Sequence, residues 1–183
     1  MEKVEVLRQY FGFSSFREGQ QTLIDAVLAG RDVLGVMPTG GGKSLCYELP
    51  ALLLPGLTLV ISPLISLMKD QVMALQNAGI PAGCIHSAMS VEELREAYRD
   101  TRFGAYKILY IAPERLLTDG FCALAQELEI SLLAVDEAHC ISQWGQDFRP
   151  SYLKILDFLQ KLPRRPALAA FTATATAQVR SDI

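Results

Sequence analysis

Short apolar runs rich in branched side chains recur along the chain and are separated by more polar segments. They cover residues 32–37, 57–62, 106–111, 130–136 and 167–171, with a weaker run at 82–85. A run of this length that lacks alternating polar positions is typical of a strand buried on both faces of a sheet. We therefore predict a sheet of buried strands that extends through most of the chain.

The first amphipathic segment lies ahead of these runs. Ser15 and Glu18 have the spacing of a capping box, and the apolar positions within 23–28 follow them. Gly30 supplies a stop signal. This pattern predicts a helix that Ser15 caps and that ends at Gly30.

Further amphipathic segments alternate with the apolar runs. One covers residues 64–78, and Ser90 with Glu93 forms a second capping box that opens another. Strands that alternate with helices predict an α/β fold with a mainly parallel sheet and helices on both faces. We expect a single domain over residues 1–183, since no linker-like stretch divides the chain.

The composition agrees with a globular protein. Of 183 residues, 50% are hydrophobic and 20% are charged, and the net charge is −3. A chain without a positive excess must bind any polyanion at a local site. The cysteines have no CxxC spacing, so we expect reduced, buried thiols; they are Cys46, Cys84, Cys122 and Cys140.

Residues 49–68 form an uncharged stretch that is long enough to cross a membrane. Pro50, Pro55 and Pro63 interrupt it, so we interpret it as the end of a helix, a turn, a strand and a turn. The N-terminus lacks the apolar core of a signal peptide. We expect a cytoplasmic protein that has no membrane partner.

A glycine-rich loop follows the first strand. It reads Thr39-Gly40-Gly41-Gly42-Lys43-Ser44. Between a strand and a helix, such a loop cradles phosphates with its backbone N–H groups. Lys43 would reach the β- and γ-phosphates, and the Ser44 hydroxyl would ligate Mg²⁺. Met37 replaces the first glycine of the usual pattern, so we expect Pro38 and Thr39 to make the turn.

Two acids end another buried strand. The apolar run 132–135 delivers Asp136 to the end of its strand, and Glu137 follows directly. At that position Asp136 would hold Mg²⁺ directly or through water, and Glu137 would polarise the attacking water as general base. We therefore predict a nucleotide-hydrolysing site in which Lys43, Asp136 and Glu137 are catalytic.

These residues resemble the superfamily 2 helicases, and among them the RecQ family of DNA helicases, over almost the whole chain. Residues 11–13 and 16–20 are similar to the family's motif 0. The resemblance implies a RecA-like P-loop fold in which Arg17 and Gln20 contact adenine. Their spacing of three predicts a shared helix face, and Phe13 is a candidate for stacking on the base.

Other segments are similar to the motifs with which the family touches DNA. Residues 62–71 resemble motif Ia, residues 110–115 resemble motif Ib, and residues 171–175 resemble motif III. The resemblance implies DNA contacts or coupling for Ser62, Pro63, Ser66, Lys69, Thr172 and Thr174.

Residues 140–150 look like the aromatic-rich loop that marks RecQ proteins. The DNA-binding or coupling candidates there are Gln143, Trp144, Phe148 and Arg149, and Gln146 replaces a common histidine. Aromatic rings offer stacking surfaces to unpaired bases. Basic residues continue beyond this loop and predict a local positive patch; they are Arg149, Lys154, Lys161, Arg164 and Arg165.

The resemblance implies the N-terminal motor lobe of a 3′-to-5′ DNA helicase, with residues 1–31 as a helical motif 0 segment. ATP and Mg²⁺ are the implied cofactors. Single-stranded and partially duplex DNA and a second RecA-like lobe are the implied partners. We expect the isolated lobe to be a monomer that binds ATP and does not unwind DNA. The alternatives are another P-loop enzyme, such as a small-molecule kinase, and a nucleic-acid-binding module that holds nucleotide only as a structural ligand.

Overall fold

The computed structural model describes residues 2–142 and 147–183, apart from the side chain of Gln178. Its sheet has six parallel strands in the order β1-β6-β5-β2-β4-β3. The strands are β1 Val33–Val36, β2 Leu57–Ile61, β3 Ala82–Ile85, β4 Ile108–Ile111, β5 Ile130–Val135 and β6 Ala167–Thr172. All the predicted strands are confirmed, and the weak one at 82–85 is the edge strand β3. The predictions for Gln143, Trp144 and Gln146 lie outside the described residues.

Helices connect the strands. They are α1 Lys3–Phe11, α2 Gln20–Leu28, α3 Leu45–Leu53, α4 Ile65–Asn77, α5 Val91–Arg102, α6 Asp119–Glu127, α7 Lys154–Lys161 and α8 Ala177–Asp182. Short 3-10 turns lie at η1 Pro113–Arg115, η2 Ala138–Ile141 and η3 Pro150–Leu153. The two turns η2 and η3 bracket the predicted aromatic loop.

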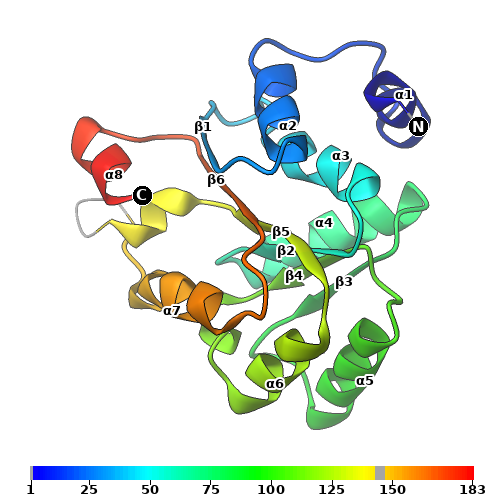
Figure 1. Cartoon of the computed structure of the whole chain (residues 1–183), viewed down its shortest axis with the longest axis vertical. Helices are drawn as coiled ribbons and strands as arrows, with labels where there is room; N and C mark the ends of the chain where they lie inside the picture. The colour runs from blue at the N-terminus through cyan, green and yellow to red at the C-terminus, as the bar shows by residue number, and fades with distance from the viewer. Residues whose placement is uncertain (1, 143–146) are drawn as a thin grey trace.

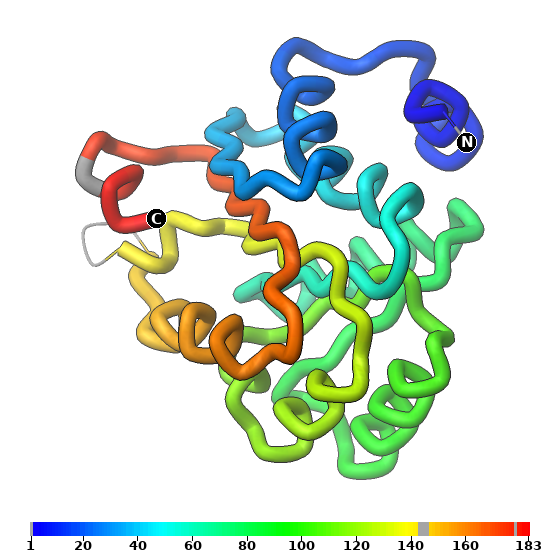
Figure 2. Tube along the Cα trace, viewed as in Figure 1, coloured from blue at the N-terminus to red at the C-terminus, as the bar shows by residue number. Residues whose placement is uncertain are grey.

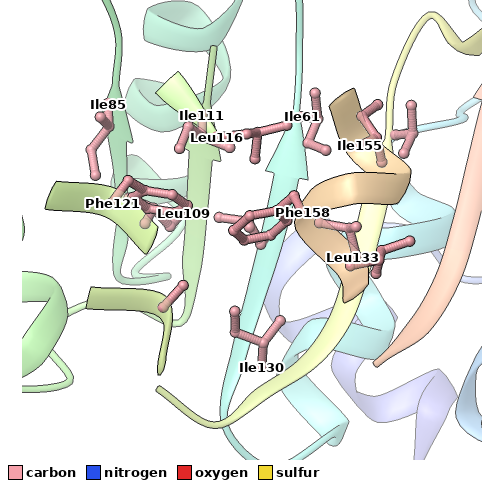
Figure 3. Packing of buried hydrophobic residues seen from close by; sticks show 14 of the residues in the cluster. Ile61, Ile85, Leu109, Ile111, Leu116, Phe121, Ile130, Leu133, Ile155 and Phe158 are labelled. Atoms are coloured by element: carbon pink, nitrogen blue, oxygen red, sulfur yellow. The ribbon is translucent and has the colours of Figure 1, made fainter. Parts of the chain in front are cut away.

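The helices form a layer on each face of the sheet (Figure 1). α2, α3 and α4 pack on one face, with Tyr47 and Met68 among the buried residues there. α5, α6 and α7 pack on the other face. In that second cluster Phe121 of α6 stacks on Phe158 of α7 above Leu109 and Leu133 of the sheet (Figure 3). The predicted architecture, a RecA-like α/β fold with both faces covered, is confirmed.

The N-terminal helix α1 lies outside these layers. Val6 and Leu7 pack with Ile24 of α2 and Leu49 of α3, and the chain reaches α2 through an extended segment (Figure 2). The sequence pattern treated residues 1–31 as one helical segment and did not separate α1 from α2.

The two predicted capping boxes have different outcomes. At α5 the Ser90 hydroxyl accepts from the Glu93 N–H, and the Glu93 carboxylate accepts from the Ser90 N–H, as predicted. At α2 the prediction was wrong, since the helix begins at Gln20 after Gly19 in the left-handed region. The turn at Gly19 separates the Ser15 side chain from the start of the helix.

Residues 49–68 form the predicted helix end, turn, strand and turn. Within the described residues no helix is both long and apolar enough to span a bilayer. All four cysteines are free thiols. Only Cys46 and Cys140 are buried, so the expectation of burial was wrong for Cys84 and Cys122, which are partly exposed.

Candidate functional site

The site is built at one edge of the sheet. Because every strand is parallel, all six carboxyl ends meet at the same edge, which we call the carboxyl edge. The loops that leave β1, β2, β4 and β5 there carry the predicted phosphate loop, motif Ia, motif Ib and the acidic pair. The fold thus brings segments that are far apart in the sequence to the place where open α/β sheets bind ligands.

The phosphate loop is a tight turn that opens onto α3. The Gly41 N–H donates to the Pro38 carbonyl at 2.9 Å, and Gly40 has φ of 77°. Thr39 and Gly40 are therefore the central residues of a turn in which the third position requires glycine. The predicted turn is confirmed with a shift of one residue, since Pro38 opens it and does not occupy its centre.

Glycine is required in this loop for space as well as for φ. A Cβ on Gly41 would lie 2.8 Å from the Pro38 carbonyl oxygen, and one on Gly42 would collide with the Gln20 amide. Met37 is compatible with the loop because it directly follows β1 and is still hydrogen-bonded to the neighbouring strand. Its N–H donates to the Thr172 carbonyl at 3.0 Å, and its side chain is buried in the core.

Motif 0 holds the loop from the other side. The Gln20 amide donates to the Gly42 carbonyl at 3.1 Å and accepts from the Arg17 N–H at 2.7 Å. The Arg17 guanidinium donates to the Gly40 carbonyl. The predicted shared helix face was wrong, because Arg17 lies in the turn before α2. Both side chains nevertheless reach the same loop.

A pocket of about 410 Å³ joins these elements. Its lining includes Phe13, Arg17, Gln20, Thr39, Gly40, Gly42, Lys43, Ser44, Asp136 and Glu137. The Phe13 ring is 50% exposed, whereas Gln20 is only 2% exposed. The pocket therefore has an aromatic rim, an amide in its wall, and a lysine and two acids at its base.

The acidic pair faces the phosphate loop. Lys43 Nζ lies 3.9 Å from Glu137 Oε1. Asp136 is 8% exposed, and burial together with the Glu137 charge raises its pKa to about 6. Glu137 has φ of 49°, a left-handed conformation that is uncommon outside glycine and clusters at functional sites.

The acidic motif is bonded to motif III. His139 Nδ1 lies 3.3 Å from Glu137 Oε2 and 3.0 Å from the Thr172 hydroxyl. That hydroxyl in turn donates to the Thr174 carbonyl at 2.9 Å. The sequence analysis assigned no role to His139, yet it joins the acidic motif to both predicted threonines of motif III.

A buried acid below the loop was not found from the sequence. Glu48 lies one turn into α3, is buried, and accepts from the Tyr110 hydroxyl at 3.2 Å. Burial raises its pKa to about 7, and the charge of Asp136 adds to this effect. Glu48 is four residues beyond Ser44, a helical spacing that places both on one face and that could have indicated this position.

The predicted DNA-contact residues that the structure describes also lie at the carboxyl edge. Ser62 is buried at the end of β2, whereas Ser66 and Lys69 are exposed on α4. The Arg149 guanidinium donates to the Pro63 carbonyl at 3.2 Å, so the loop after η2 is bonded to motif Ia. Phe148 is partly exposed beside Arg149.

The predicted basic patch was wrong. Arg149 lies at the carboxyl edge, but Arg165 pairs with Asp32 just before β1, at the opposite edge of the sheet. Helix α7 spans the distance between them. Basic residues that are close in the sequence are therefore divided between the two edges.

The comparisons with known proteins show the family to which the chain belongs. A family model described as DEAD/DEAH box helicase matches residues 17–183. The chain belongs to the DEAD/DEAH box helicase family. Within it, the sequence is 51% identical to the ATP-dependent DNA helicase RecQ of Bacillus subtilis, over 97% of this chain and 30% of that protein. It is 48% identical to the RecQ helicase of Haemophilus influenzae, over 98% of this chain and 29% of that protein.

Solved structures agree on the fold. A hypothetical ATP-dependent RNA helicase from Sulfolobus tokodaii matches with a TM-score of 0.75 at 23% identity, over 98% of this chain and 52% of that one. The Mycobacterium smegmatis helicase Lhr, solved with ssDNA and AMP-PNP, matches with a TM-score of 0.73 at 21% identity, over 95% of this chain and 25% of that one. The chain spans less than a third of the length of the RecQ helicases of Bacillus subtilis, Pasteurella multocida and Haemophilus influenzae.

Proposed function

We propose that this chain is the ATP-binding motor lobe of a RecQ-type DNA helicase, which moves 3′ to 5′ on single-stranded DNA and unwinds duplex during repair and recombination. The observation that carries the proposal is the pocket where Lys43 and Glu137 face each other below the motif 0 amide. The RecQ relatives support DNA as the partner. A second motor lobe would close over the pocket.

The residues fit a nucleotide with Mg²⁺. The cradle at Gly41 and Gly42 has no room for a Cβ, so backbone N–H groups can approach phosphate oxygens closely. Among the described residues there is no group of three or more His, Cys, Asp or Glu side chains that could hold a metal alone. This suits Mg²⁺, which takes few protein ligands together with phosphates. Ser44 and Asp136 would hold it, and it would neutralise charge on the phosphates.

The side chains then divide the work of hydrolysis. Lys43 would bind the terminal phosphates through charge-assisted hydrogen bonds. Glu137 would orient a water and take its proton, and its hydrogen-bond distance to His139 would keep the carboxylate aimed. The contacts from His139 through Thr172 to Thr174 give DNA-facing loops a route to this carboxylate.

Adenine preference would come from motif 0. Gln20 already uses part of its hydrogen-bonding capacity on Gly42 and Arg17. Its amide still has a second N–H and a second carbonyl lone pair, which match an acceptor and a donor side by side on a purine edge. Guanine presents two acceptors at that edge, so it would leave the carbonyl unpaired.

The proposal is tested by titrating the chain with Mg-ATP and with Mg-GTP. The variants are Lys43→Ala and Gln20→Ala, and Gln21→Ala serves as the matched control because Gln21 is the exposed neighbour. We expect ATP to bind more tightly than GTP, Lys43→Ala to weaken the binding of both nucleotides, and Gln20→Ala to lose only the preference for ATP. Equal binding of ATP and GTP by the wild type would contradict the adenine role and favour another P-loop enzyme.

A further inference from the structure

The Tyr47 hydroxyl is a buried polar group to which the proposed mechanism gives no role. Tyr47 lies in the first turn of α3, is 1% exposed and packs its ring against Phe171 of β6, with the ring centroids 5.6 Å apart. Its hydroxyl has no hydrogen-bond partner among the residues that the structure describes. Buried hydroxyls are ordinarily paired, because an unpaired one has lost its hydrogen bonds to water without replacement. The unpaired hydroxyl therefore requires an explanation.

Helix geometry brings Tyr47 close to Ser44, one of the two residues proposed to hold Mg²⁺. The Tyr47 N–H donates to the Ser44 carbonyl at 3.1 Å. Side chains three residues apart in a helix lie on the same face. The Ser44 hydroxyl makes no capping hydrogen bond at the start of α3. It is therefore not committed to the helix and can turn toward another partner.

A third hydroxyl, that of Tyr110 in β4, lies on the other side of Tyr47. It donates to Glu48 Oε1 at 3.2 Å, and a tyrosine hydroxyl that donates can still accept. Burial and the charges of Asp136 and Glu48 raise the pKa of Tyr47, so its hydroxyl keeps its proton. The Ser44 and Tyr110 hydroxyls are close enough to oppose this rise, although neither makes a hydrogen bond of normal geometry with Tyr47.

We propose that Tyr47 is a positioning residue, which holds the Ser44 hydroxyl in the orientation that Mg²⁺ requires. The inference rests on the proposed function, which makes Ser44 a ligand of the metal. A serine oxygen that faces a cation must point its proton away from it, and the Tyr47 oxygen would accept that proton in a hydrogen bond. Tyr47 would donate in turn to Tyr110, which already donates to Glu48. Hydrogen bonds in such a line polarise and strengthen one another.

The test compares ATP binding by the wild type and by Tyr47→Phe, in Mg²⁺ and in EDTA, by calorimetric titration. Phenylalanine keeps the ring that packs against Phe171 and removes only the hydroxyl. We expect the variant to bind Mg-ATP roughly 3- to 10-fold more weakly, the effect of one hydrogen bond, and to bind ATP in EDTA as the wild type does. Tyr98→Phe is the matched control, because Tyr98 is partly buried against Phe121 on the opposite face of the sheet.

Stability without nucleotide separates positioning from a merely structural role. Because the Tyr47 hydroxyl makes no hydrogen bond in this structure, its removal should leave the midpoint of denaturant unfolding unchanged or raise it. A lower midpoint, together with ATP binding that is weakened equally in Mg²⁺ and in EDTA, would show that the hydroxyl only supports the fold and would overturn the proposal.

A double-mutant cycle with Ser44→Ala tests whether Tyr47 acts through Ser44. If it does, Tyr47→Phe should cost no further affinity for Mg-ATP once the serine hydroxyl is gone, whereas fully additive losses would overturn the proposal.

The failure of this inference and that of the proposed function are distinguishable. If Mg²⁺ does not strengthen ATP binding by the wild type, the proposed nucleotide site and the role of Tyr47 fail together. If the wild type depends on Mg²⁺ and Tyr47→Phe keeps that dependence in full, only the positioning role is wrong.

Discussion

Charged side chains have different surroundings at the two edges of the sheet. At the amino edge, Arg165 pairs with Asp32, and the pKa of that carboxyl is lowered by the guanidinium. At the carboxyl edge, burial raises the pKa of Asp136 to about 6 and that of nearby Glu48 to about 7. The charged groups at the amino edge neutralise each other as an ion pair. The two carboxyls at the carboxyl edge have no partner among the described residues that fully compensates the cost of burying their charge.

The size of a pocket does not distinguish the edges in the same way. The amino edge carries a pocket of about 610 Å³, larger than the one beside the phosphate loop. Polar groups near it are already engaged, since Lys107 Nζ donates to the Leu54 and Gly56 carbonyls at 2.7 Å. Polar groups that lack a partner therefore indicate a functional site better than the volume of a pocket does. A ligand can form new hydrogen bonds or ion pairs only with groups that still lack them.

The largest expected effect is on turnover by Glu137→Gln. Removing the general base should lower ATP hydrolysis by ~10²- to 10⁴-fold while Mg-ATP binding persists. Steady-state phosphate release and equilibrium titration measure the two properties separately. Unchanged turnover would favour the alternative in which the protein holds nucleotide only as a structural ligand. The carboxyl edge would then have no catalytic role that distinguishes it from the amino edge.

The next effect concerns Glu48→Gln and pH. Folding raises the pKa of Glu48 from 4.5 to about 7. Between these two pH values, the folded state therefore keeps a proton on Glu48 that the unfolded state has released. The wild type should lose stability as the pH rises through this window, on the order of 3 kcal/mol in total. Glutamine keeps a partner for Tyr110 and does not ionise.

Denaturant unfolding at pH 5 and pH 8 measures this difference. Glu48→Gln should gain stability relative to wild type at pH 8 and gain little at pH 5. Glu92→Gln, at an exposed position of α5, is the control for loss of one acid. A Glu48→Gln effect that is the same at both pH values would show that Glu48 is not held in this way.

Lys43→Ala should weaken Mg-ATP binding by roughly 10- to 100-fold, the worth of a charge-assisted hydrogen bond to phosphate. Fluorescent nucleotide titration measures the change. Arg164→Ala is the comparison at the amino edge, where the side chain is exposed beside the larger pocket. Equal losses in the two variants would mean that general charge governs binding.

The smallest effect is expected for Arg165→Gln. Its ion pair with Asp32 is exposed, and such pairs contribute about 0.2 to 1 kcal/mol. We expect a small loss of stability in denaturant and no change in nucleotide titration. A clear loss of nucleotide affinity would contradict the purely structural role of this edge.

Local patterns predicted the fold well because each strand is an uninterrupted apolar run and the sheet is parallel. The phosphate loop and the acidic pair were found because their chemistry is contiguous in the sequence. Glu48 and His139 could not be found in this way, since their hydrogen-bond partners Tyr110 and Thr172 come from other strands. The predicted basic patch was wrong for a related reason. Arg149 and Arg165 are close in the sequence, but helix α7 lies between them and places them at opposite edges of the sheet.

The central claim is that nucleotide and DNA share the carboxyl edge and leave the amino edge alone. Backbone amide shifts of the labelled chain, recorded with Mg-ATP and then with oligo-dT, test it most directly. Mg-ATP should shift the amides around Gly42 and Asp136, and oligo-dT those around Ser62 and Ser66. Neither should shift the amides that line the pocket between Leu54 and Arg164. Shifts centred on that pocket with either ligand would contradict the account.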